Sequence, residues 1–110
     1  MITTHVLDTA LGRPARAVPI QLDVRDGDAW RAVGAGETDA DGRLRTLTPD
    51  GPVAVGTYRL RFDTAAYFAQ HDVAGFFPSV EIQFIVRAGE GHHHVPLLLS
   101  PFGYSTYRGS

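Results

Sequence analysis

The segment best suited to chemistry covers residues 92–110, where three consecutive histidines begin an apolar stretch. In a strand, successive side chains point to opposite faces. His93 therefore shares the core face with three aliphatic side chains, and His94 lies on the opposite surface. Histidine titrates near neutral pH and can take up or release a proton during a reaction. Because a turn at residues 100–103 leads into a run rich in Tyr, Arg and Ser at residues 104–110, we expect a site beside His94.

A second histidine and an arginine come from other parts of the chain. His5 lies in an alternating stretch, residues 2–7, on the face opposite Val6. Arg43 directly follows a turn at residues 39–42, where Asp and Gly favour a tight backbone. A guanidinium group offers a fixed fork of donors to a substrate oxygen. Taken one by one, however, His5 is typical of a surface histidine and Arg43 of a solvated side chain.

The histidine run also raises the possibility of a metal site. His92 and His94 lie about 6.6 Å apart along one face of an extended strand. This spacing suits zinc only if further ligands join them, and the sequence shows no evident third ligand. We therefore expect no functional metal, while adventitious binding by His92 and His94 stays open.

The rest of the chain is organised as short strands separated by turn signals. Alternating or apolar patterns predict strands at residues 2–7, 20–25, 30–38, 56–63, 80–86, 92–99 and 104–110. One helix is expected from Ala65 to about His71, with Asp63 or Thr64 as its N-terminal cap. Seven to eight strands with one short helix predict an all-β fold, an antiparallel β-sandwich.

Composition limits the class of protein. With 44% hydrophobic and 20% charged residues, the 110-residue chain fits one folded domain over residues 1–110. The net charge is −2 and the ten basic residues are scattered, which argues against nucleic-acid binding. No segment reaches the roughly 18 apolar residues of a membrane helix, and the first residues lack the pattern of a signal peptide. Because the sequence also contains no cysteine, we expect a cytoplasmic protein without disulfides.

Several separate motifs resemble those of one known family. They are THVLDTALGRPA, TDADGR, GTYRLRFDTAAYF, and HxHVPLLLSPFGYST followed by YRGS. In this order they are similar to the 5-hydroxyisourate hydrolases, the transthyretin-like enzymes of purine catabolism, over nearly the whole chain. The resemblance implies a transthyretin-like β-sandwich that assembles as a homotetramer, a dimer of dimers, with active sites at the dimer–dimer interface. It also implies cofactor-free hydrolysis of 5-hydroxyisourate, the product of urate oxidation, to 2-oxo-4-hydroxy-4-carboxy-5-ureidoimidazoline.

The functional residues of the family fall on His5, Arg43, His94 and the segment from Tyr107 to Ser110. The resemblance implies that histidine acts as the general base and that Arg43 binds a substrate oxygen. Which histidine is the base stays open, and we favour a cooperating pair with His94 slightly ahead of His5. Ser110 is expected to add a hydroxyl group and the α-carboxylate of the chain.

The remaining residues of the C-terminal motif are expected to complete the pocket. Tyr107 forms a wall, Arg108 holds the chain end, and together with Gly109 they are assigned to substrate binding. His93 stands where the family usually has tyrosine, and on the core side it should affect packing alone. Transthyretin, a hormone carrier, shares the fold but lacks this set of residues. A small-ligand binding protein without catalysis is therefore the alternative interpretation.

Overall fold

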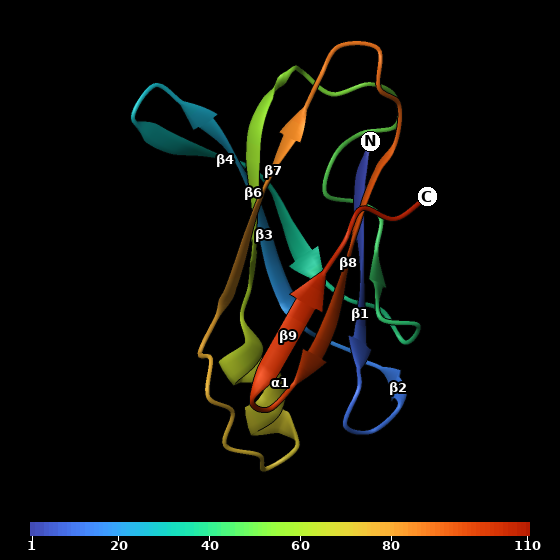
Figure 1. Ribbon diagram of the computed structural model, residues 1–110, viewed down its shortest axis with the longest axis vertical. Helices are drawn as coiled ribbons and strands as arrows, with labels where there is room; N and C mark the ends of the chain where they lie inside the picture. The colour runs from blue at the N-terminus through green and yellow to red at the C-terminus, as the bar shows by residue number, and fades with distance from the viewer.

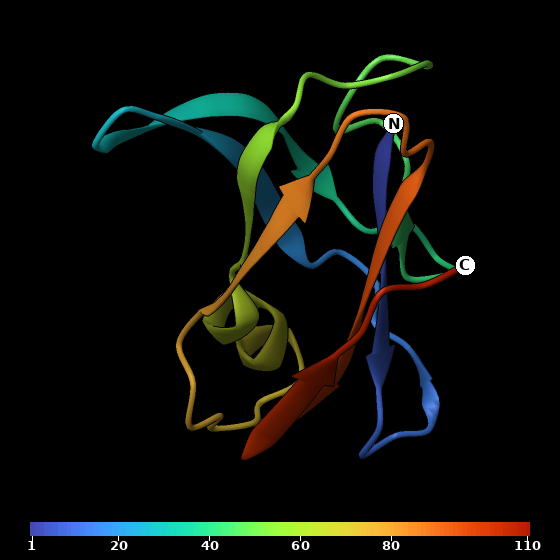
Figure 2. The same ribbon diagram turned by 45° about the horizontal axis from the view of Figure 1, so that its top comes forward.

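Two β-sheets face each other in the computed structural model, which describes all of residues 1–110 (Figure 1). One sheet has the strand order β2-β1-β8-β9, with β5 also paired to β1, and the other has the order β4-β3-β6-β7. The first sheet consists of β1 (Ile2–Asp8), β2 (Arg13–Pro14), β5 (Arg43–Leu44), β8 (His93–Ser100) and β9 (Gly103–Thr106). The second consists of β3 (Pro19–Asp26), β4 (Ala29–Glu37), β6 (Gly56–Phe62) and β7 (Val80–Val86). Figure 2 shows the two layers, with the helix α1 at one end between them.

The predicted β-sandwich is confirmed, with two differences in detail. Seven strands have four or more residues, and β2 and β5 add two short ones. All pairings are antiparallel except that of β1 with β8, which is parallel from Ile2 opposite His93 to Asp8 opposite Leu99. A parallel pair needs a long crossover connection, and here the chain passes through the whole second sheet between the two strands. The last predicted strand is also shorter, because β9 ends at Thr106 and only Gly109 pairs again, with His94.

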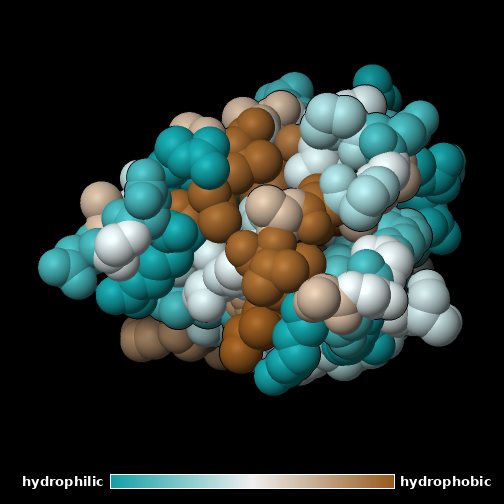
Figure 3. All heavy atoms as spheres, turned by 90° about the horizontal axis from the view of Figure 1, so that it is seen from above, coloured by the Kyte–Doolittle hydropathy of each residue, from teal (hydrophilic) through white to brown (hydrophobic).

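The core lies between the inner faces of the two sheets. Twenty buried hydrophobic residues form one cluster, to which β1, β3, β6, β7 and β8 contribute alternate positions, while β4 contributes none. In β8 these are Val95, Leu97 and Leu99, and His93 is buried beside them with 3% of its surface exposed, as alternation predicts. Burial of one large aliphatic side chain stabilises a fold by about 1.5–3 kcal/mol. Figure 3 looks onto one end of the sandwich, where hydrophobic residues form a central band between hydrophilic flanks.

The helix α1 (Thr64–Gln70) closes one end of the sandwich and confirms the predicted helix. Asp63 is its N-terminal cap, and its carboxylate accepts a hydrogen bond from the N–H of Ala66 at 3.0 Å. The hydroxyl of Tyr67 donates to the carboxylate of Asp8, at the end of β1, over 2.7 Å. This bond ties the helix to the sheet that carries the candidate site. α1 is neither long nor apolar enough to cross a membrane.

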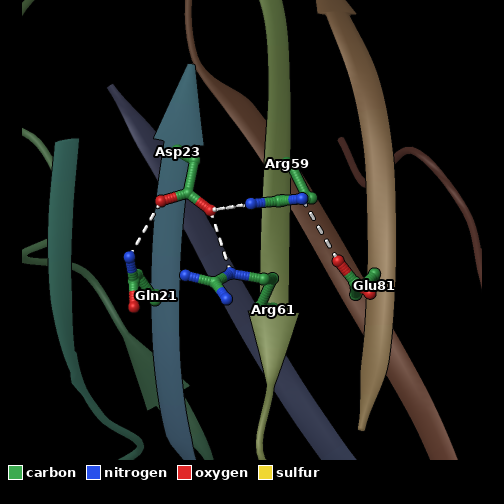
Figure 4. A network of polar contacts seen from close by, with 5 residues as sticks. All are labelled: Gln21, Asp23, Arg59, Arg61 and Glu81. Atoms are coloured by element: carbon green, nitrogen blue, oxygen red, sulfur yellow. Dashed lines mark hydrogen bonds and ion pairs between the residues drawn. The ribbon is translucent and has the colours of Figure 1, made fainter. Parts of the chain in front are cut away.

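A network of charged side chains covers the outer face of the second sheet (Figure 4). One carboxylate oxygen of Asp23 accepts from Arg59 and from Arg61 at 2.9 Å each, and the other accepts from Gln21 at 2.9 Å. Arg59 also approaches Glu81 at 3.4 Å. Burial raises the pKa of Asp23, but the hydrogen bonds from Arg59 and Gln21 and the arginine charges together lower it below its usual value. These arginines therefore hold neighbouring strands together.

Candidate active site

Strand β1 lies at the centre of the candidate site, because β5 pairs with one of its edges and β8 with the other. The β1–β5 register places His5 opposite Arg43, and the β1–β8 register places Thr3 opposite His94. Residues opposite each other in paired strands point to the same face, as do residues two apart in one strand. All four side chains consequently share the outer face of the first sheet.

A tight turn delivers Arg43 to this face. Gly42 has a positive φ of 75°, and a Cβ atom there would collide with the carbonyl oxygen of Val6, so only glycine fits. The carboxylate of Asp39 accepts hydrogen bonds from the backbone N–H groups of Asp41 and Arg43, at 2.9 and 3.0 Å. The bond from Arg43 holds the pKa of Asp39 below its usual value. The turn thus fixes where β5 begins, and therefore the backbone position from which the side chain of Arg43 extends.

The C-terminal segment runs directly over the ring of His94. The N–H of Gly109 donates to the carbonyl oxygen of His94 at 2.8 Å. A Cβ atom added to Gly109 would lie 2.5 Å from Cδ2 of His94, closer than real Cβ contacts come. Upstream, the hydroxyl of Thr106 donates to the carbonyl oxygen of Pro96 at 2.7 Å and holds β9 on β8. The segment therefore reaches the histidine because position 109 has no side chain.

These elements surround a pocket of about 380 Å³, a volume suited to a small molecule. Its lining residues are Met1, Thr3, Thr4, Arg43, Arg45, His92, His94, Tyr107, Gly109 and Ser110. The side chains include two arginines and no carboxylate, so the pocket favours a ligand that is anionic or rich in acceptor oxygens.

Five of the seven predicted site residues line this pocket, namely Arg43, His94, Tyr107, Gly109 and Ser110. His5 lies next to Arg43 in the sheet but is absent from the lining, and its Nε2 atom is buried without a hydrogen-bond partner. Arg108 points elsewhere and forms an ion pair with Glu90 at 2.8 Å. The structure thus does not bring Arg108 to the pocket as a substrate-binding side chain, and its contact instead anchors the chain end to the loop before β8.

Comparison with known proteins shows the family of the chain. A model of the HIUase/Transthyretin family matches residues 2–109. The chain belongs to this family. The 5-hydroxyisourate hydrolase of Salmonella typhimurium is 41% identical over 110 residues, which is 100% of this chain and 81% of the relative.

Solved structures of the HIUase/Transthyretin family show the same fold. The 5-hydroxyisourate hydrolase of Klebsiella pneumoniae has a TM-score of 0.86 and 38% identity, covering 99% of this chain and 97% of that one. Sea bream transthyretin, solved in complex with thyroxine, has a TM-score of 0.92 and 32% identity, covering 98% of this chain and 93% of that one. Since the two proteins match the backbone about equally well, side chains of the pocket must distinguish between their activities.

Sequence reasoning missed five lining residues as members of the site. They are Met1, Thr3, Thr4, Arg45 and His92. Arg45 follows Arg43 by two residues, so strand alternation could have indicated it, and His92 shares a face with His94 in the same way. No local sequence pattern indicates Thr3. Its position in the pocket depends on the parallel pairing of β1 with β8, two strands that are far apart in the sequence.

The electrostatic surroundings keep His94 neutral near pH 7. Burial lowers its pKa below the ordinary 6.5, and the nearby His92, Arg43, His5 and Arg45 lower it further, in that order. The ring is therefore ready to accept a proton. One of its nitrogens, Nδ1, lies 2.8 Å from the hydroxyl of Thr3, which also lies 2.7 Å from Nε2 of His92. The structure brings no three His, Asp or Glu side chains together in a way that could hold a metal ion.

Proposed function

We propose that the protein hydrolyses 5-hydroxyisourate to 2-oxo-4-hydroxy-4-carboxy-5-ureidoimidazoline, in urate degradation and without a cofactor. The observation that carries this proposal is the pocket where His94, Arg43 and the end of the chain meet. Relatives named for this activity match the chain along its whole length. A positively charged pocket beside a neutral histidine suits the attack of water on an oxygen-rich ring.

In the proposed reaction, water opens an activated ring amide. The water oxygen bonds to the carbonyl carbon, the C–N bond breaks, and one water proton ends on the released nitrogen. His94 takes the proton from water through Nε2, because its Nδ1 is engaged by Thr3, and returns it to the leaving nitrogen. His5, one strand away beside Arg43, assists as the second histidine of the pair.

Arg43 and Arg45 stabilise the negative charge that develops on the attacked carbonyl oxygen. Both guanidinium groups line the pocket, where they offer positive charge and a fork of N–H donors to an oxygen. Donors that are already oriented toward a developing oxyanion are usually a large part of catalysis. Tyr107, Gly109 and Ser110 shape the remaining wall and bind the ring.

The activity should depend on pH through His94. Because its pKa is lowered, the basic form prevails down to a pH below 6.5. We expect the acid limb of kcat/KM to have its midpoint below this value, and a midpoint above it would argue against His94 as the base. The lowered pKa of His94 also makes the stability of the fold depend on pH. Between the pKa of His94 in the folded protein and 6.5, its value in the unfolded chain, the unfolded chain binds more protons, so stability rises with pH. The contribution of His94 to stability is thus present above pH 6.5 and is lost as the pH falls through the folded pKa.

We further propose that residues 1–110 act as one domain in a homotetramer, a dimer of dimers, with the sites at the dimer–dimer interface. β7 and β9 are edge strands with one unpaired side each, which favours pairing with another copy. Exposed large hydrophobic side chains on or beside these strands are Ile85, Phe102, Tyr104 and Tyr107. Sedimentation analysis should give four times the mass of the chain, and full activity of a monomer would contradict shared sites.

A cytoplasmic location is also proposed, and it is supported by a cysteine-free chain that needs no oxidising compartment. Fractionation of cells that produce the protein tests it. Recovery in a secreted or membrane fraction would overturn it.

The experiment that tests the function is a direct ultraviolet assay. Urate oxidase generates 5-hydroxyisourate in place, and the decay of its absorbance is followed with and without the protein, each with EDTA present. We expect a protein-dependent decay that EDTA does not slow. Decay at the spontaneous rate would leave the second candidate, a carrier of small ligands, which the fold shared with a thyroxine-bound transthyretin favours. Displacement of a fluorescent aromatic ligand would then be the next measurement.

A further inference from the structure

A buried hydroxyl group connects two histidines at the edge of the pocket. Thr3 is 3% exposed, and its Oγ1 atom lies 2.7 Å from Nε2 of His92 and 2.8 Å from Nδ1 of His94. Both distances are those of good hydrogen bonds. The contacts arise because β1 and β8 pair in parallel with Thr3 opposite His94, so that alternation puts His92 on the same face.

Proton counting restricts how this trio is arranged. A hydroxyl group has one proton to donate, and a neutral imidazole has one N–H donor and one acceptor nitrogen. If Thr3 donates to His92, then His94 donates from Nδ1 to Thr3, and Nε2 of His94 keeps a free lone pair. In the reverse arrangement Thr3 donates to Nδ1 of His94, whose proton then sits on Nε2. If both rings donated, the buried hydroxyl proton would have no acceptor, which is costly.

Only the first arrangement leaves a free lone pair on Nε2 of His94, and the positive charges near the ring favour it. The guanidinium groups of Arg43 and Arg45 line the same pocket as His94. A lone pair directed toward positive charge is more stable than an N–H group in the same place. His92 has the matching task, because its Nε2 must accept the proton of Thr3 for Thr3 to accept from His94.

We propose that Thr3, supported by His92, is a positioning residue that fixes His94 in the tautomer with its proton on Nδ1 and its Nε2 free to take a proton from water. This inference rests on the proposed function, in which His94 is the general base. Thr3 and His92 touch no reacting atom in this scheme. They act through His94, whose ring orientation and tautomer are set by the hydrogen bond at its other nitrogen.

Two variants of Thr3 separate the hydroxyl from the rest of the side chain. Thr3→Val keeps the shape and loses the hydroxyl, and Thr3→Ser keeps the hydroxyl. We expect Thr3→Val to lower kcat on the order of 10–100-fold with little change in KM, by analogy with the loss of a partner that orients a metal-bound histidine. Thr3→Ser should restore most of kcat. His92→Phe, at an exposed position, provides a second test if Thr3→Val does not fold, and it should lower kcat in the same direction.

A spectroscopic measurement reads the tautomer without any turnover. In protein labelled with ¹⁵N-histidine, at a pH where the rings are neutral, the nitrogen shifts of His94 should show a protonated Nδ1 and a bare Nε2. Thr3→Val should move them toward the opposite tautomer, and Thr3→Ser should not. A protonated Nε2 in the unaltered protein, or an unchanged kcat in Thr3→Val, would overturn the inference. Failure of the unaltered protein to hydrolyse 5-hydroxyisourate would instead overturn the proposed function, while the nitrogen shifts still decide the tautomer.

Discussion

Replacing His94 with alanine should lower kcat/KM for 5-hydroxyisourate by about 10²–10⁴-fold, the usual contribution of a general acid–base group. His94 lines the pocket, and its lowered pKa keeps the ring neutral and able to accept a proton. The effect should fall mainly on kcat, because the arginines that bind the substrate remain in place. The measurement is the rate of absorbance decay over a range of substrate concentrations.

The fold should tolerate this change, since His94 is only half buried and lies outside the hydrophobic cluster. Thermal unfolding and the mass in solution check that point. His71→Ala is a matched control, because His71 is an exposed histidine just after α1 and lies outside the pocket. Near-normal turnover by His94→Ala would remove His94 from the mechanism and leave His5 as the candidate base.

The second large effect is expected from Gly109→Ala. The added Cβ atom would lie 2.5 Å from Cδ2 of His94 and 3.3 Å from its carbonyl oxygen, so the chain end or the ring must shift. A displacement of about 1 Å in a catalytic arrangement can cost on the order of 10²-fold in rate. We therefore expect a loss of that size in kcat/KM. The melting temperature should change little, because the segment after β9 is mostly exposed.

Gly103→Ala is the control for Gly109→Ala. Gly103 begins β9 in the same part of the chain, and a Cβ there would meet only the hydroxyl oxygen of Ser100, at an ordinary distance of 3.7 Å. It should keep normal activity. Full activity in Gly109→Ala would show that the chain end is not held against His94 during turnover, and a collapsed melting temperature would make the segment structural.

Local sequence patterns were sufficient to predict most of the secondary structure and which strand side chains face the core. Alternation alone placed His93 in the core and His94 on the outer surface, and both positions are confirmed. The helix was also predicted, and of the two caps proposed for it, Asp63 and Thr64, the structure shows Asp63. A cap is a contact between neighbouring residues, and an amphipathic strand carries its burial pattern in its own residues.

Contacts between distant segments were decided by the tertiary structure. The parallel pairing of β1 with β8 brings Thr3 between two histidines about ninety positions away, which no local pattern can encode. This parallel pair is also the point at which the observed sandwich departs from the fully antiparallel one that the sequence predicted. Register between strands far apart in sequence depends on how both sheets close over one core, so it emerges only when the whole chain is folded.

Arg45, which lines the pocket, and Arg108, which does not, illustrate the same distinction. Arg45 shares the face of Arg43 by alternation, yet the pocket that it lines exists only because the distant C-terminal residues Tyr107, Gly109 and Ser110 line it too. Arg108 belongs to the terminal motif, but its side chain turns away to Glu90, eighteen residues earlier in sequence. Residue types near the chain end could indicate a site, while only the folded backbone decides which side chains enter it, because side-chain direction depends on strand twist and on the partners within reach.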